Sequence, residues 1–128
     1  MKNKITAYLI DPETKTVNPV SITDSLECYY PTLRCDLIDI VDRRIGGKRY
    51  TIICDDEALL RDDPLISAIG DLGDPMLFGA LLVVNSDRHT GALLSLEPSD
   101  IDHIARHIHH HGTRRHPEGW PMLCQVTW

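Results

Sequence analysis

Residues 103–116, HIARHIHHHGTRRH, hold six of the seven histidines in the chain. His103, His107 and His111 recur every four residues, and on a helix this spacing can present two imidazoles to one Zn²⁺. A zinc site also needs a third ligand and groups that orient the ligands, and no HExxH sequence supplies a general base here. We therefore predict a solvated helix face and no cofactor, with weak zinc binding as the alternative.

A second chemically distinctive stretch, RRIGGKR, carries four positive charges in a chain whose net charge is −6. Glycine lets the backbone approach an anion closely, and forked guanidinium groups bind phosphate oxygens in pairs. Another basic cluster, Arg106, Arg114, Arg115 and His116, is expected at the end of the final helix. The candidate ligand-binding residues are Arg43, Arg44, Gly46, Gly47, Lys48, Arg49, Arg114 and Arg115. If the two clusters converge they predict a site for a phosphate-bearing ligand; the alternative is a solvated, charged turn.

Catalytic patterns are weak by comparison. The acidic run Asp55-Asp56-Glu57 could bind Mg²⁺, but capping of a helix start accounts for it more simply. Cys54 lies beside this run without an identifiable base, and the chain has no P-loop, GxGxxG or GxSxG sequence. We therefore expect a non-enzymatic protein, with a metal- or thiol-dependent hydrolase or nuclease as the alternative.

Composition sets limits on the class of protein. A chain of 128 residues that is 42% hydrophobic is long enough for one folded domain. The four cysteines contain no CxxC pair, which favours reduced thiols in the cytoplasm. No apolar run approaches the roughly 18 residues of a membrane helix, and the first such run is too short for a signal peptide. The acidic net charge and an aromatic content of 5% argue against nucleic acid as a partner.

The clearest structural pattern is a β-hairpin. DLIDIVDRRI and KRYTIIC are β-rich runs joined by Gly46-Gly47, which favours a two-residue turn of the primed type. That register sets Val41 opposite Ile52, and it sets Arg44 opposite Arg49, a like-charge pair that normally destabilises a sheet. Before the hairpin we expect a strand from Ile5 and an edge strand, VNPVSI, followed by a short helix that Pro31 ends.

After the hairpin, the acidic run leads into a short helix or two turns, and MLFGALLVVN is typical of one central strand covered on both faces. Apolar residues from Ile101 to Ile108 then recur at helical spacing behind a capping box at Ser99 and Asp102, and Gly112 ends this helix. The expected fold is α+β: one mostly antiparallel sheet of five or six strands, two short helices and a C-terminal amphipathic helix.

Three segments, IGGKRYTIICDDEALL, PMLFGALLVVN and SLEPSDIDHI, together resemble an uncharacterised domain-of-unknown-function family of small bacterial, phage and mobile-element proteins. The resemblance covers roughly Lys4 to His111, so we place the domain at residues 1–111 and an irregular extension at 112–128. Where such proteins commonly have glycine after the acidic run this chain has Ala58, which indicates a helical position. The resemblance implies an intracellular accessory role and assigns no activity to any residue.

The extension contains both tryptophans, Trp120 and Trp128. They are expected to dock the extension on the domain, because exposing two indoles is unfavourable, although they could instead anchor a partner. The leading hypothesis is a binding protein of phage or mobile-element type that captures a phosphate-bearing, nucleotide-like ligand or inhibits a host defence protein. A pure protein–protein interaction module is the remaining alternative.

Overall fold

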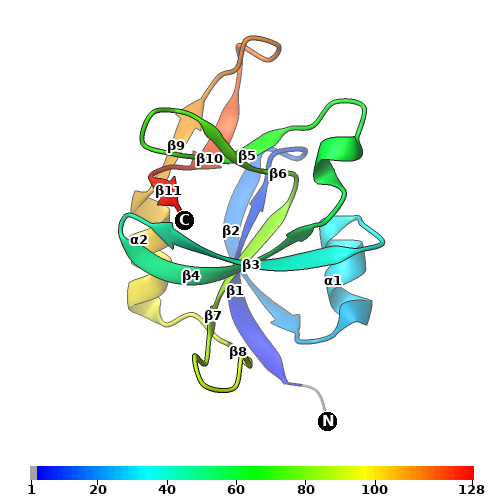
Figure 1. Cartoon of the computed structure of the whole chain (residues 1–128), viewed down its shortest axis with the longest axis vertical. Helices are drawn as coiled ribbons and strands as arrows, with labels where there is room; N and C mark the ends of the chain where they lie inside the picture. The colour runs from blue at the N-terminus through cyan, green and yellow to red at the C-terminus, as the bar shows by residue number, and fades with distance from the viewer. Residues whose placement is uncertain (1–2) are drawn as a thin grey trace.

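The computed structural model describes residues 3–128 and has an α+β fold with two sheets and two α-helices (Figure 1). The strands are β1 (Lys4–Asp11), β2 (Thr16–Thr23), β3 (Ile38–Ile45), β4 (Lys48–Asp55), β5 (Ile66–Ile69), β6 (Pro75–Phe78), β7 (Leu81–Ser86), β8 (Leu93–Leu94), β9 (Ile108–His111), β10 (Trp120–Leu123) and β11 (Val126–Thr127). The helices are α1 (Leu26–Leu33), the short 3₁₀ helix η1 (Ala58–Leu60) and α2 (Pro98–Arg106).

The larger sheet has seven antiparallel strands in the order β11-β3-β4-β7-β1-β2, with β8 pairing the end of β7. The smaller sheet has the order β6-β5-β10-β9, and its β5–β10 pair is parallel. The C-terminal extension contributes a strand to each sheet, β10 to the smaller one and β11 to the larger one. The observed larger sheet therefore has more strands than the five or six that we predicted, and a second sheet, which we did not predict, packs with it.

The β3–β4 hairpin has the predicted register. Gly46 and Gly47 adopt φ angles of 56° and 84°, as a type I′ turn requires at both central positions. Val41 lies opposite Ile52 and Arg44 opposite Arg49. The edge position predicted for the Pro19 strand is also confirmed, because β2 is the last strand of the larger sheet.

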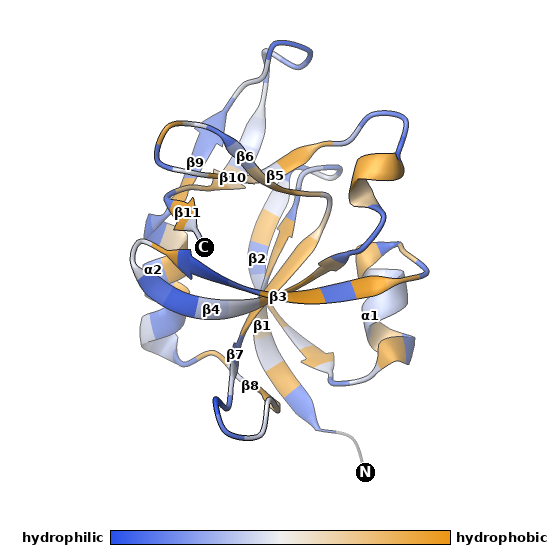
Figure 2. Ribbon diagram, in the orientation of Figure 1, coloured by the Kyte–Doolittle hydropathy of each residue, from blue (hydrophilic) through white to orange (hydrophobic). Residues whose placement is uncertain are grey.

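Both faces of the larger sheet are covered, so its middle strand β7 is buried along Leu81–Val84 (Figure 2). One face packs with α2 and the smaller sheet around Ile52, Val83 and Ile104. The other face packs with α1, where Ile53 and Leu82 meet Tyr29 and Leu33. The apolar sequence of β7 follows from this double coverage.

The prediction that MLFGALLVVN forms one strand is wrong. The segment divides at Gly79, whose φ of +77° turns the chain and whose N–H donates to the carbonyl of Leu65 at 2.8 Å. As a result, β6 joins the smaller sheet and β7 becomes the middle of the larger one. Apolar residues on both parities fit either arrangement, because they report burial and not the sheet to which a strand belongs.

The helix predicted to run to Gly112 is also wrong in its extent. It begins after Glu97, whose N–H donates to the Asp100 carboxylate at 2.9 Å, and it ends at Arg106. After His107, residues Ile108–His111 form β9, which pairs with β10 from Ile108↔Leu123 to His111↔Trp120. Partners that come from the distant extension therefore override the helical periodicity of the sequence.

The short helix predicted after the acidic run is confirmed as η1, which Ala58 begins, and the segment then enters β5 as a strand. One local prediction needs correction as well. Helix α1 passes Pro31 and ends at Leu33, with Arg34 in the left-handed conformation as its C-cap. Over residues 3–128, neither α-helix has the length and apolar character that crossing a lipid bilayer requires.

Candidate functional site

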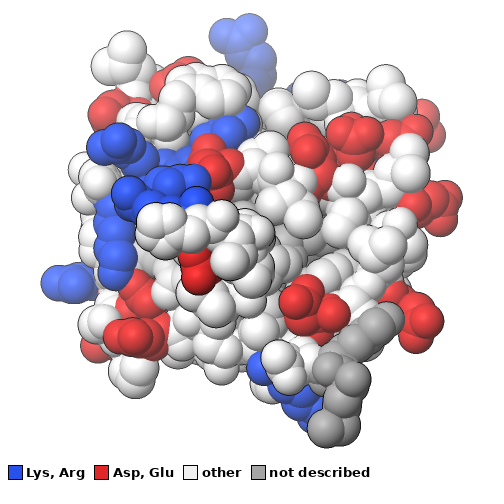
Figure 3. All heavy atoms as spheres, turned by 60° about the horizontal axis from the view of Figure 1, so that its bottom comes forward, with Lys and Arg blue, Asp and Glu red and all other residues white. Residues whose placement is uncertain are grey.

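The hairpin tip borders a pocket of about 400 Å³, which we call the basic pocket. Its lining residues are Asp42, Arg43, Arg44, Gly47, Arg49, Arg88 and Trp128. Figure 3 shows lysine and arginine gathered on this side of the molecule, whereas aspartate and glutamate dominate the opposite side of the same view. The local charge is positive because four arginines face a single aspartate.

Hairpin geometry accounts for most of this clustering. The register sets Arg44 and Arg49 side by side on one face, which would be repulsive without a counter-charge. Arg49 donates to Asp42 at 2.6 Å, and the hydroxyl of Thr51 donates to the other oxygen of Asp42 at 2.8 Å. The Arg49 hydrogen bond holds the pKa of Asp42 below its usual range. Asp42 therefore neutralises Arg49 and leaves Arg44 without a counter-charge.

Three arginines of the basic pocket have no carboxylate within ion-pair distance in the part of the chain that the structure describes: the half-buried Arg43 and the exposed Arg44 and Arg88. Arg44 comes from β3, and Arg88 comes from the turn between β7 and β8. Two exposed guanidinium groups without a counter-charge, next to a third at Arg49, form a concave donor array that suits an anion with several oxygens.

An aromatic ring, that of Trp128, also lines the basic pocket. The guanidinium carbon of Arg43 lies 3.9 Å from the ring centroid of Trp128, a cation–π contact, and the indole remains 80% exposed. Nη1 of Arg43 donates to the carbonyl of Asp42 at 2.7 Å, but its Nε is buried and has no hydrogen-bond partner among residues 3–128. The pocket thus combines an unpartnered buried donor with an exposed aromatic surface.

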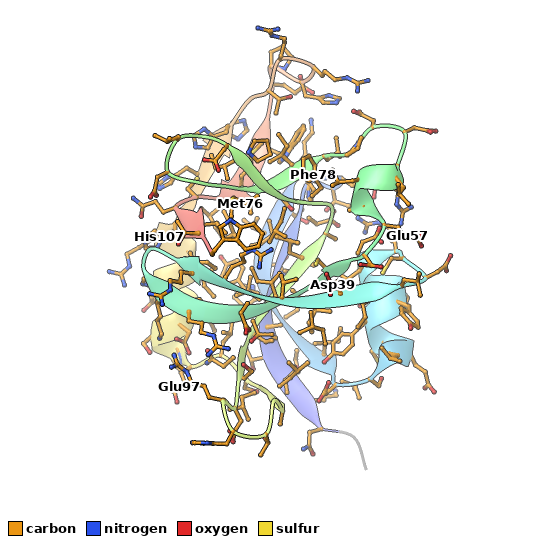
Figure 4. The ribbon with its side chains drawn as sticks, viewed as in Figure 1. Asp39, Glu57, Met76, Phe78, Glu97 and His107 are labelled. Atoms are coloured by element: carbon orange, nitrogen blue, oxygen red, sulfur yellow. The ribbon has the colours of Figure 1, made fainter. Side chains whose placement is uncertain are left out.

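Lys48 and Gly46 have structural roles instead. The Lys48 ammonium contacts the buried carboxylate of Asp100, which also accepts hydrogen bonds from Asn85 at 2.8 Å and from the Tyr50 hydroxyl at 3.2 Å. Burial opposes ionisation of Asp100, but hydrogen bonds from Lys48, from the Glu97 N–H and from Asn85 outweigh it and lower its pKa to about 2. Lys48 therefore fastens the hairpin to the start of α2. Gly46 packs against His107, which Figure 4 labels near the tip of the β3–β4 hairpin.

The second basic cluster does not join the first. Arg114 and Arg115 lie in the connection between β9 and β10, at the far end of the molecule from the β7–β8 turn (Figure 1). Arg115 and His116 both pair with Asp63, at 3.4 Å and 2.8 Å. Arg88 takes the place that the sequence reasoning gave to these arginines. Its position in SDRHTG, directly after β7, gives no local signal in the sequence, because only the pairing of β7 with β4 brings Arg88 to the hairpin tip.

The three candidate metal-binding histidines are divided between two elements. His103 and His107 belong to the end of α2, where His103 Nε2 donates to the carbonyl of Ile45 and His107 Nδ1 donates to the carbonyl of His103, each at 2.7 Å. His111 lies in β9, opposite Trp120. Within residues 3–128, no group of three or more His, Cys, Asp or Glu side chains is arranged to hold a metal ion. The interval of four residues therefore does not produce the single ligand face that a continuous helix would have formed.

The acidic run and Cys54 also have structural surroundings. Asp55 accepts hydrogen bonds from Arg61 at 2.7 Å and from the N–H of Glu57 at 2.9 Å, which stabilises the turn into η1. Burial raises the pKa of the Cys54 thiol to about 12. A thiol in that state is a poor nucleophile near neutral pH.

The fold and this site together define a small α+β domain with a basic pocket at the tip of a β-hairpin. The chain belongs to the DUF3846 family, a domain of unknown function, which matches residues 5–109. No curated protein and no solved structure matches the chain. The resemblance to a family of unknown function that the sequence suggested is therefore confirmed. Because this family has no assigned function, any proposal about function must be argued from the site.

Proposed function

We propose that this protein binds a phosphate-bearing, nucleotide-like small molecule in the basic pocket and does not transform it. The observation that carries the proposal is the pair of exposed guanidinium groups without a counter-charge, Arg44 and Arg88, beside the paired Arg49. An acidic chain that concentrates cations in one hollow has a local field suited to a small anion, while its net charge of −6 repels a long polyanion such as DNA.

Trp128 supports a ligand that carries an aromatic base. One face of its indole contacts the Arg43 guanidinium, and its high exposure leaves room for a planar group on the ring. Base–aromatic stacking and guanidinium–phosphate hydrogen bonds are the two contacts that nucleotides commonly receive from proteins. We further propose that the protein acts inside the cell. In a phage or mobile element it could capture a nucleotide signal of the host.

The test is isothermal titration of the purified protein with phosphate, pyrophosphate and nucleoside mono-, di- and triphosphates. Arg44→Glu combined with Arg88→Glu should raise the Kd for the best ligand about tenfold or more, since each charge-assisted hydrogen bond contributes roughly 1.5–3 kcal/mol. Arg114→Glu combined with Arg115→Glu is the matched control, because it makes the same change of charge outside the pocket. An equal loss of affinity in both double variants would show that the effect comes from the net charge of the protein and not from the basic pocket.

A protein partner is the second candidate, favoured by exposed leucines and not by the basic pocket. Leu59 and Leu60 of η1 expose most of their side chains, as does Leu72 in the connection between β5 and β6. Inhibition of a host defence protein belongs to this candidate. A chain that binds no compound of the titration panel but is retained by a partner through Leu59 and Leu60 would favour it over ligand capture.

A further inference from the structure

The strands β4 and β7 separate next to the basic pocket. Their pairing runs from Cys54↔Leu81 to Thr51↔Val84 and goes no further. Both strands continue, with Arg49 and Tyr50 on β4 and Asn85 and Ser86 on β7, but β7 turns away to pair with β8. Figure 1 shows the β7–β8 hairpin pointing away from the tip of the β3–β4 hairpin.

This separation opens a second hollow of about 420 Å³, which we call the split groove. Its walls include Tyr50, Asn85, Ser86 and Ser95, together with Arg49 and Arg88. The same two arginines line the basic pocket, so the two hollows adjoin at Arg49 and Arg88. A ligand with phosphates on Arg49 and Arg88 therefore has space on both sides, toward Trp128 and into the split groove.

The split groove differs from the basic pocket in chemistry. Its lysine, Lys48, is already engaged by Asp100, and Glu97 adds a negative charge at its rim. Hydroxyl and amide groups make up much of the remaining polar lining, at Thr51, Asn85, Ser86 and Ser95. Such a lining suits an uncharged, hydroxyl-bearing group better than a further phosphate.

The direction of the hydrogen bonds makes Ser86 an acceptor toward the split groove. The Thr51 hydroxyl has one proton, which it donates to Asp42 at 2.8 Å. The contact of 2.7 Å between the hydroxyls of Thr51 and Ser86 must then carry the Ser86 proton. The lone pairs of the Ser86 oxygen remain available, so a ligand hydroxyl that donates is complementary to this position.

From this geometry we infer that the ligand is a nucleoside diphosphate joined to a second, hydroxyl-bearing sugar. The base stacks on Trp128, the two phosphates lie between Arg44, Arg49 and Arg88, and the second sugar occupies the split groove with a hydroxyl donating to Ser86. This inference rests on the proposed function and specifies its ligand class. It is non-covalent binding, with no bond made or broken.

The test compares ligands that differ only in the second sugar: ADP with ADP-ribose, and UDP with UDP-glucose. We expect the wild-type protein to bind one sugar-bearing compound roughly tenfold more tightly than its parent diphosphate. Ser86→Ala should remove this preference and leave the affinity for the diphosphate unchanged. The retained diphosphate binding also shows that the variant is folded. Leu94→Trp, which narrows the split groove, should have the same effect by steric exclusion.

The possible results separate the two proposals. Equal affinity for the diphosphate and its sugar-bearing partner in both pairs would overturn the extended ligand and keep the basic pocket as an anion site. A sugar preference that survives in both Ser86→Ala and Leu94→Trp would also overturn it, because the sugar would then bind elsewhere. No binding of any of the four compounds would overturn the proposed function itself, and the extended ligand with it.

Discussion

Gly46 lies against the imidazole of His107, so closely that a Cβ on Gly46 would be 2.2 Å from His107 Nε2. The contact joins the tip of the β3–β4 hairpin to the end of α2, next to the hydrogen bond from His103 to the carbonyl of Ile45. The N–H of Gly46 also donates to the carbonyl of Gln125 at 3.1 Å. The tip that carries the basic pocket is thus anchored from two directions, which would preorganise its arginines for the ligand that we propose.

The two turn glycines should therefore respond differently to alanine. Gly47→Ala incurs only the cost of a left-handed backbone, about 1–2 kcal/mol, since nothing lies within 4 Å of its Cβ position. Gly46→Ala should lose a further 1–3 kcal/mol or so, because the methyl group must displace the His107 ring. Urea unfolding of both variants measures the difference. Equal destabilisation would mean that the His107 contact does not hold in solution.

Asp100 should give the protein part of its acid sensitivity. Its pKa is about 2 in the folded state against an ordinary 3.8, so the ionised carboxylate stabilises the fold above about pH 4 by roughly 2 kcal/mol. This contribution is lost as the pH falls from 4 through 2. Asp100→Asn should therefore destabilise the protein by about that amount at pH 7 and by little near pH 2.

Urea unfolding at pH 7 and near pH 2 tests the Asp100 prediction. Asp102→Asn is the control, because Asp102 lies on the exposed side of the same helix. A gap between wild type and Asp100→Asn that is as wide near pH 2 as at pH 7 would show that the lost side-chain geometry matters and the charge does not.

The hairpin could be predicted from sequence because its information is local. Gly46-Gly47 fixes the turn, and the turn fixes the opposition of Arg44 and Arg49. The edge position of the Pro19 strand likewise follows from the proline, which has no N–H to donate. Each of these features depends on a few neighbouring residues and not on a distant partner.

The failures share a cause, which is pairing with remote segments. His109 and His110 form a strand because they pair with β10. Similarly, β6 is separate from β7 because it pairs with β5 in the smaller sheet. The residues of the site divide in the same way into those that depend on local sequence and those that depend on remote pairing. The arginines of the hairpin could be found from the sequence, whereas Arg88 could not, because its approach to the tip depends on β7 pairing with β4. The separation of β4 from β7 that forms the split groove has no counterpart in the sequence pattern.

The two tryptophans, which the sequence does not distinguish, should differ sharply in how much stability the fold loses when each is replaced by alanine. Trp120 is 2% exposed, packs with Met122, and donates from Nε1 to the carbonyl of Ile66 at 2.7 Å. Trp120→Ala should cost roughly 3–5 kcal/mol, whereas Trp128→Ala should change stability by less than about 1 kcal/mol and weaken ligand binding. Thermal unfolding and titration of both variants measure this. A stable Trp120→Ala protein would show that β10 contributes little to the fold.

Zinc should leave the folded protein unaffected. His103 and His107 each use a ring nitrogen on a backbone carbonyl, and His111 lies on a different element. A metal that binds only the native state raises the Tm by mass action, so Zn²⁺ and EDTA should give the same Tm. The triple variant His109→Ala, His110→Ala, His111→Ala serves as the control. A rise in Tm that EDTA reverses, and that this variant lacks, would restore a metal site on β9.

One cysteine should react with an alkylating reagent faster than the other three in the native protein. Cys28 is half-buried, while Cys35, Cys54 and Cys124 are buried, and burial raises the pKa of each of these three thiols. The thiolate is the reactive form, so iodoacetamide at pH 8 should label Cys28 first and Cys54 only after unfolding. Mass spectrometry of native and urea-unfolded protein gives the sites, and Cys28→Ser should remove the fast reaction. Rapid labelling of native Cys54 would contradict its burial and return a thiol-dependent enzyme to consideration.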